Sequence, residues 1–226
     1  MKKFGFTLAE TLITLGIIGV VAAMTIPNLI TEHQKRATVT KLQRAISVIN
    51  QAYRLAYDDV GEASAEEASN MGSEEYFNTY WAPYIKVLTY CSSYKVCSYS
   101  SHTPFKQANG SSYSFGVSPG NTRTTFLTMD GFLYVVRVTD GNGNKSSTIH
   151  VDINGSSGPN ILGRDLFVLI RVEGSDIIEG GAGVQPYGYD KTDKQINSNC
   201  SSTGSGEYCA EKIRRAGWKI EKDYPW

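Results

Sequence analysis

The chain has 226 residues, 41% of them hydrophobic and 19% charged, and its formal net charge is zero. This length suits one globular domain with an appendage, and the composition is ordinary for a folded protein. Because there is neither a basic surplus nor a run of Lys and Arg interleaved with aromatic residues, the sequence argues against a nucleic-acid partner.

A long apolar segment begins near the start of the chain. Between Phe6 and Thr31 the only ionisable side chain is that of Glu10. As a helix this segment would be about 39 Å long, enough to cross a bilayer core of about 30 Å. Lys2 and Lys3 precede it, and the positive-inside rule keeps that end cytoplasmic. We therefore expect the rest of the chain outside the cytoplasm.

Two ordinary interpretations of this segment are an uncleaved anchor and a signal peptide cut after Ala23. Both leave Glu10 unexplained, since an acid at the centre of a membrane helix costs about 2.5–3.5 kcal/mol. A third interpretation starts from the order of the residues around that acid.

The chain begins MKKFGFTLAETLITLGIIGVVAAMTIPNL. This segment resembles the N-terminus of type IV prepilins and of the pseudopilins of type II secretion, in which a short basic leader precedes Gly, Phe, Thr, Leu, a variable residue, Glu and an apolar helix. The residues that match are Gly5, Phe6, Thr7, Leu8 and Glu10. The resemblance is specific over about residues 1–30 and only architectural beyond them. It implies that a prepilin peptidase cuts between Gly5 and Phe6 and that Phe6 is then N-methylated.

The resemblance, together with electrostatics, predicts an assembly role for Glu10. Cleavage would leave a basic amine on Phe6, and in a filament the amine of an incoming subunit can meet Glu10 of a neighbour, so that each charge offsets the burial of the other. The expected partners are sister subunits, the prepilin peptidase and the inner membrane. The expected divisions are a leader (1–5), a transmembrane or filament-core helix (6–31) and an extracytoplasmic globular domain (32–226).

Helical periodicity continues past the apolar segment. Apolar residues recur at spacings of three and four, namely Val39, Leu42, Ile46, Ile49, Tyr53 and Ala56. The sequence therefore predicts one helix from about Phe6 to about Asp58, kinked near Pro27 and ended by Gly61. Its second half carries a single apolar stripe, which requires a partner in the remaining chain.

That partner is predicted to be a sheet. After a polar connector and a short aromatic-rich helix, β-type runs occur at 113–117, 124–129, 132–138, 147–153 and 166–172. Turn signals between the second, third and fourth runs predict an antiparallel meander of about four strands. The tail is expected to form a short helix that stops at Gly217 and then to finish as a strand. The predicted fold class is α+β and pilin-like, a long N-terminal helix packed on an antiparallel sheet.

The cysteines form two local pairs, which suit an exported domain. Four cysteines allow three disulfide connectivities, and closure entropy favours the short loops Cys91–Cys97 and Cys200–Cys209. Neither spacing is that of a zinc site, and with three histidines in the chain no metal site is predicted.

A Gly- and Asn-rich segment between two of the predicted strands allows two interpretations. It contains Asp152, Asn154, Asn160 and Asp165. One interpretation is a tight loop in which Gly and Asn take positive φ. The other is a calcium loop, because major pseudopilins bind calcium in a late loop, although the EF-hand pattern is absent. No cofactor is otherwise predicted.

The sequence contains no Walker A or HExxH motif, so no catalytic residue is predicted and the chain is not expected to be an enzyme. His150, in a predicted strand, is expected to face solvent or a neighbouring residue. The predicted function is that of a structural pilin or pseudopilin subunit. A type II secretion system is favoured, and a type IV or competence pilus is the other filament that the sequence allows. The alternative is an exported β-rich binding module or adhesin with an ordinary signal peptide.

Overall fold

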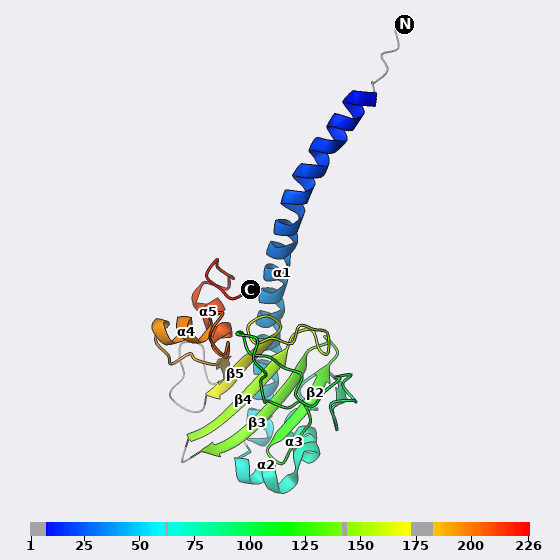
Figure 1. Ribbon diagram of the computed structural model, residues 1–226. Coiled ribbons are helices and arrows are strands. Elements are labelled where there is room, and N and C mark those ends of the chain that lie inside the picture. The colour runs from blue at the N-terminus through cyan, green and yellow to red at the C-terminus, as the bar shows by residue number, and fades with distance from the viewer. Residues whose placement is uncertain (1–7, 62, 142–143, 173–182) are drawn as a thin grey trace. The chain divides into compact units, whose positions relative to one another are not determined.

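The computed structural model describes residues 8–61, 63–141, 144–172 and 183–226 (Figure 1). The chain divides into two compact units, Met1–Ala37 and Thr38–Trp226. Helix α1 (Leu8–Val60) supplies the described part of the first unit and opens the second. The second unit adds an antiparallel sheet of six strands, so the predicted α+β class, with a long N-terminal helix and an antiparallel sheet, is confirmed.

Within the second unit, α1 buries one stripe of side chains against the sheet. The buried residues are Val39, Leu42, Ala45, Ile49, Ala52, Tyr53 and Ala56. Ile46, which was predicted to belong to this stripe, is only partly buried and packs at its margin. The alanines take the central positions because the sheet comes close: the hydroxyl of Tyr134, which is fully buried, donates to the Ala45 carbonyl at 3.0 Å.

The end of α1 lies close to its predicted position. The helix stops at Val60, and Gly61 follows at φ 78° with its N–H donated to the Tyr57 carbonyl at 3.1 Å. A positive φ is easily reached by glycine, which explains the stop. The single aromatic-rich helix predicted next is in fact two helices, α2 (Ala65–Met71) and α3 (Ser73–Tyr80), because Gly72 at φ 81° separates them.

The sheet is a meander in which each strand pairs with the next along the chain. Its order is β1-β2-β3-β4-β5-β6, and the strands are β1 (Val87–Tyr90), β2 (Arg123–Thr128), β3 (Leu133–Gly141), β4 (Asn144–Asp152), β5 (Leu166–Val172) and β6 (Gly183–Pro186). The four predicted central strands are confirmed as β2 to β5. The turn predicted at 129–131 is confirmed as well, since Gly131 takes φ 80° and donates its N–H to the Thr128 carbonyl at 2.9 Å.

Two predictions about strands were wrong. Residues 113–117 form no strand, because this segment lies over the sheet and packs Val117 into it. The tail after α5 (Cys209–Arg215) also forms no strand among the described residues 216–226. The edge strands β1 and β6 were not predicted; each is four residues long, too short for a clear alternation.

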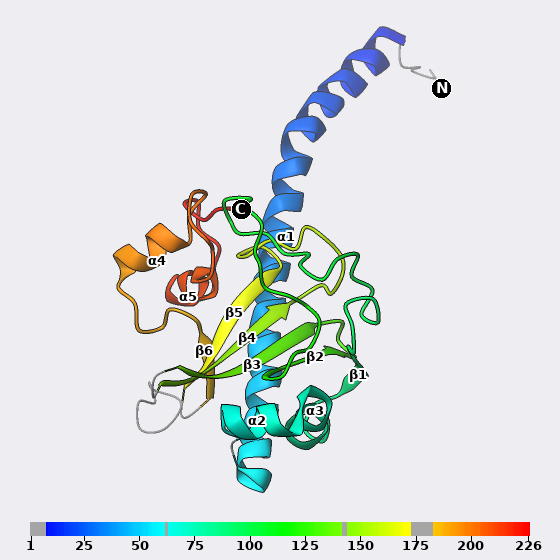
Figure 2. The same ribbon diagram turned by 60° about the horizontal axis from the view of Figure 1, so that its bottom comes forward.

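The two faces of the sheet carry two different cores. The face toward α1 holds the larger core, to which Phe126, Tyr134, Ile149 and Leu169 belong. The opposite face is covered by the long connection between β1 and β2, and its core includes Phe105, Val117, Leu133, Val135 and Val168. Figure 2 shows this connection, in green, and α1 on either side of the strands. The sheet is therefore sandwiched between a helix and a loop.

Strand β6 is also joined to α1 by a side chain. The Asn50 amide nitrogen donates to the Val184 carbonyl at 2.7 Å, and the Val184 N–H donates to the Asn50 amide oxygen at 2.6 Å. Both backbone groups of Val184 thus have a partner on the side away from β5.

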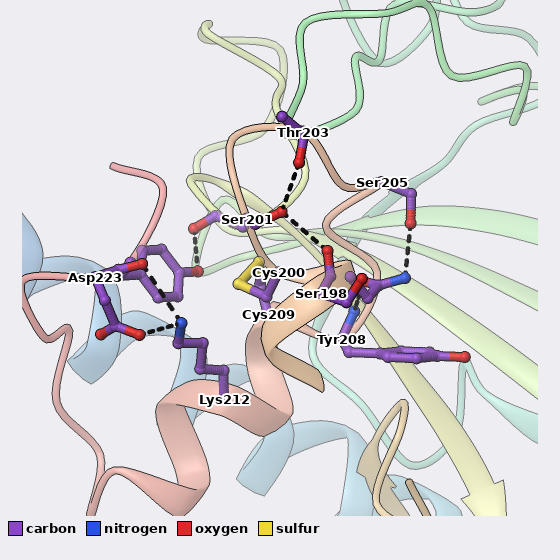
Figure 3. The surroundings of a disulfide bond; sticks show 12 residues. Ser198, Cys200, Ser201, Thr203, Ser205, Tyr208, Cys209, Lys212 and Asp223 are labelled. Carbon is purple, nitrogen blue, oxygen red and sulfur yellow. Dashed lines mark hydrogen bonds and ion pairs between the residues drawn. A yellow bond between two sulfur atoms is a disulfide. The ribbon is translucent and has the colours of Figure 1, made fainter. Parts of the chain in front are cut away.

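Both predicted disulfides are present, Cys91–Cys97 and Cys200–Cys209. The second joins helix α4 (Asp193–Asn199) to α5 (Figure 3). Helix α4 was not predicted, although a capping box of Thr192 and Gln195 marks its start. Figure 3 also shows Lys212 of α5 bound to Asp223 of the tail at 2.6 Å, which fixes the tail to this disulfide-linked pair of helices.

Candidate functional site

The residues predicted for processing and assembly lie at the start of the chain. Gly5 and Phe6 fall outside the residues that the structure describes. Glu10 is exposed and lies in the first turn of α1. The partial positive charge at a helix N-terminus stabilises a carboxylate there, so this position lowers the cost of keeping an acid at the edge of an apolar helix.

The large apolar side chains between Leu8 and Ile30 are exposed. They are Leu8, Leu12, Ile13, Leu15, Ile17, Ile18, Val20, Val21, Met24, Ile26, Leu29 and Ile30, with exposed fractions of 51–79%. By length and composition α1 can cross a membrane, so it is a possible membrane anchor. A β-carbon added at Gly16 or Gly19 would meet no atom within 4 Å, so packing within the described chain does not require glycine at either position.

The polar side chains of this segment bond back to the helix itself. The hydroxyls of Thr25 and Thr31 donate to the carbonyls four residues earlier, at 2.9 and 3.0 Å. The Asn28 amide donates to the Met24 carbonyl at 3.4 Å. A side chain that satisfies its donor within its own helix can enter hydrocarbon at lower cost, which suits the same anchor.

The Gly- and Asn-rich loop between β4 and β5 is held by its own hydrogen bonds. Gly155, Asn160 and Gly163 take positive φ, as the tight-loop interpretation predicted. The Asp165 carboxylate accepts from the backbone N–H groups of Asn160 and Ile161, both at 2.7 Å. Burial raises the pKa of Asp165, while these backbone donors act to lower it.

Asp152, the last residue of β4, is a second buried carboxyl beside this loop, and it is fully shielded from solvent. It accepts from the Tyr99 hydroxyl at 2.9 Å and from the Asn154 N–H at 3.2 Å. Burial, and then the nearby Asp165, raise the pKa of Asp152 well above its usual value. A calcium ion would have to displace these donors. Across the described ranges, His, Cys, Asp and Glu side chains do not gather in groups of three or more that could hold a metal ion.

His150 faces neighbouring residues and not solvent, which is one of the two environments predicted for it. The residue is 4% exposed because the connection between β1 and β2 covers this face. Phe115 stacks on the ring with centroids 3.5 Å apart. Tyr113 contacts the His150 Nε2 at 2.9 Å and donates to a Glu207 carboxylate oxygen at 3.0 Å. Burial, followed by the charges of Arg137 and Arg123, lowers the pKa of His150 to about 3, so the ring is neutral.

Those two arginines were missed at the level of sequence. Arg123 of β2 lies directly opposite Arg137 of β3, and both line an open pocket. The predicted turn at 129–131 could have revealed them. In a hairpin centred on residue 130, positions 123 and 137 are equally far from the turn and therefore lie opposite each other. Like charges directly opposite each other destabilise a sheet, so such a pair suggests a role outside folding.

The comparison with known families covers the whole second unit and the end of the first. Residues 28–226 match the model of a family described as "Family of unknown function (DUF6613)". Neither the curated proteins nor the solved structures contain a match to the chain. The family match includes the sheet, both disulfides and the two arginines. Because it covers most of the sequence, the chain belongs to this family of unknown function, DUF6613.

Proposed function

We propose that this protein is a pilin-like structural subunit of a membrane-rooted filament, most of all the pseudopilus of type II secretion. The observation that carries the proposal is the exposed apolar surface of α1 between Leu8 and Ile30. Exposed apolar patches of this size mark membrane or protein contacts. In the proposal, lipid covers this surface before assembly and sister helices cover it afterwards.

The order of residues around the proposed cleavage site supports this choice over an ordinary anchor. A simple anchor has no use for an acid one turn into its helix, whereas a filament subunit does. Glu10 would pair with the methylated amine of Phe6 on a neighbouring subunit and so fix the register of the helices. Gly16 and Gly19, which packing within the described chain does not require, would let those helices approach closely.

The remaining features suit a globular unit outside the cytoplasm. Two disulfides join all four cysteines, and structural disulfides persist in oxidising compartments such as the periplasm. A single-pass protein of the inner membrane, with residues 32–226 in the periplasm or outside the cell, is therefore part of the proposal.

The test compares two acids on the same helix. Glu10→Gln removes the charge while preserving shape; Glu32→Gln is the matched control, since Glu32 is exposed on α1 beyond the apolar segment. We expect the Glu10 variant to be cleaved and membrane-bound yet absent from sheared or cross-linked filaments, whereas the Glu32 variant assembles as wild type does.

N-terminal sequencing of the mature protein supplies the second measurement. N-methylated Phe6 supports the proposal, and a mature chain that begins at Met24 would instead identify an ordinary signal peptide and the binding-module alternative. Normal assembly of the Glu10→Gln variant would contradict the charge-pairing role.

A further inference from the structure

A pocket of about 480 Å³ lies on the sheet face opposite α1. Arg137 is two residues from Val135, which belongs to the core of that face, so the alternation of β3 places both on the same side. The residues used below are Tyr113, Phe115, Asn121, Thr122, Arg123 and Arg137, all of which line the pocket. Its volume falls within the range of about 300–1,000 Å³ typical of small-molecule sites.

The two charged residues that line this pocket, Arg123 and Arg137, are both positive. Among its lining residues there is no acid. The structure places Arg123 and Arg137 opposite each other across two paired strands, and the Arg123 Nε is buried without a hydrogen-bond partner in the described part of the chain. Burial, followed by the charge of Arg137, lowers the pKa of Arg123. Folding alone therefore gains nothing from bringing these two groups together.

The surroundings hold one arginine in a fixed place. The Arg123 guanidinium lies over the Phe115 ring, 5.5 Å from its centroid, and Phe115 in turn stacks on the neutral His150. Tyr113 ties this stack to Glu207 through a hydrogen bond of 3.0 Å. An arginine supported by a partly buried aromatic stack is preorganised to bind an anion with little loss of side-chain entropy.

The chemistry of the lining defines the ligand. Two guanidinium groups favour a planar carboxylate or a phosphate, to which arginine can make paired hydrogen bonds. Asn121 and Thr122 add polar side chains, while Tyr113 and the half-buried Phe115 offer ring surface beside the charges. The pocket therefore suits a small organic anion in which the charged group adjoins a planar apolar group.

We propose that Arg123 and Arg137 form a binding site for a small organic carboxylate or phosphate ester on the face of the sheet away from α1. The site is independent of the filament proposal, since it uses neither the apolar segment nor Glu10.

The test titrates the full chain, in non-ionic detergent micelles, with benzoate and with phenyl phosphate, and follows the arginine Nε–H signals by NMR. Sodium chloride at matched ionic strength is the reference. We expect the arginine Nε–H signals to shift and reach saturation with at least one probe. Tighter binding of benzoate would identify a carboxylate ligand, and tighter binding of phenyl phosphate a phosphate ester. Arg137→Gln should weaken binding by about tenfold or more, since a charge-assisted contact is lost.

Lys219→Gln is the matched control, because it removes one positive charge from an exposed position outside the pocket and should leave binding unchanged. Without ligand, Arg137→Gln should melt no lower than wild type, since the variant removes a like-charge contact. Absence of saturable binding by either probe, equal affinity in the Arg137 variant, or a lower melting temperature of that variant would each overturn the proposal.

Discussion

The two halves of α1 differ in what their apolar side chains contact. From Leu8 to Ile30 the large apolar residues are exposed around the whole helix. From Val39 to Ala56 they form one stripe, and that stripe is buried in the core of the second unit. One continuous helix thus serves two environments: its second half is stabilised by the sheet of the same chain, while its first half offers its apolar surface to something else.

The sharpest way to break this comparison is the same substitution in each half. Leu42 is fully buried and Ile18 is 58% exposed. Leu42→Asp places a carboxylate in the core without a partner and should cost more than about 4 kcal/mol, enough to unfold the second unit. Ile18→Asp should leave that unit folded. Near-ultraviolet circular dichroism in micelles, which reports the packing of aromatic side chains, measures both.

Ile46→Asp should fall between these two, because Ile46 is only partly buried. Equal losses of the dichroism signal from Leu42→Asp and Ile18→Asp would mean that the two halves do not differ as described.

A smaller effect sharpens the contact between helix and sheet. Tyr134→Phe removes the hydroxyl that donates to the Ala45 carbonyl and should lower the free energy of unfolding by roughly 0.5–1.5 kcal/mol in urea titrations. Tyr57→Phe is the control, since Tyr57 lies on the same helix with 54% of its surface exposed, and it should change stability by less than about 0.5 kcal/mol. An equal loss of unfolding free energy in the two variants would mean that the hydrogen bond to Ala45 is not the cause of the destabilisation.

The smallest expected effect concerns ion pairs on the two halves. Arg44 binds Asp130 of the β2–β3 turn through two hydrogen bonds, at 2.8 and 3.1 Å. Both side chains are partly exposed, so a double-mutant cycle should give a coupling of about 0.2–1 kcal/mol that weakens with salt. Lys35→Ala breaks the pair with Glu32 in the first unit and should leave the free energy of unfolding of the second unit unchanged. A loss of stability similar to that from breaking the Arg44 pair would contradict the difference between the two halves.

The sequence was sufficient for elements whose signal is local. Strands β2 to β5 alternate clearly or run continuously apolar, glycines mark the C-terminal end of α1 and the turn at 129–131, and the short spacings of the cysteines predicted both disulfides. These features depend on neighbours within a few residues, so the sequence of this one chain was enough.

The features that were missed depend on distant parts of the chain. Alternation in β4 placed His150 on one face, but only the fold shows that residues 91–122 bury that face as well. The same covering segment explains why residues 113–117, although apolar and aromatic, add no strand. To predict that Arg123 faces Arg137, the pairing register of β2 and β3 must be known. That register follows from the position of the turn between the strands, whereas the alternation within each strand does not reveal it. Gly5 and Phe6 lie outside the described residues and stay predictions.

The bond between Asn50 and Val184 has a consequence for association. An outer strand of a sheet offers unpaired backbone groups to any extended chain, a common route to aggregation. In β6 the amide of Asn50 occupies the donor and the acceptor of Val184 as a seventh strand would. A foreign strand would have to displace this side chain, which is held on a helix anchored in the core. The edge next to α1 is therefore blocked against strand addition, so copies of this protein can crowd together without merging their sheets at β6.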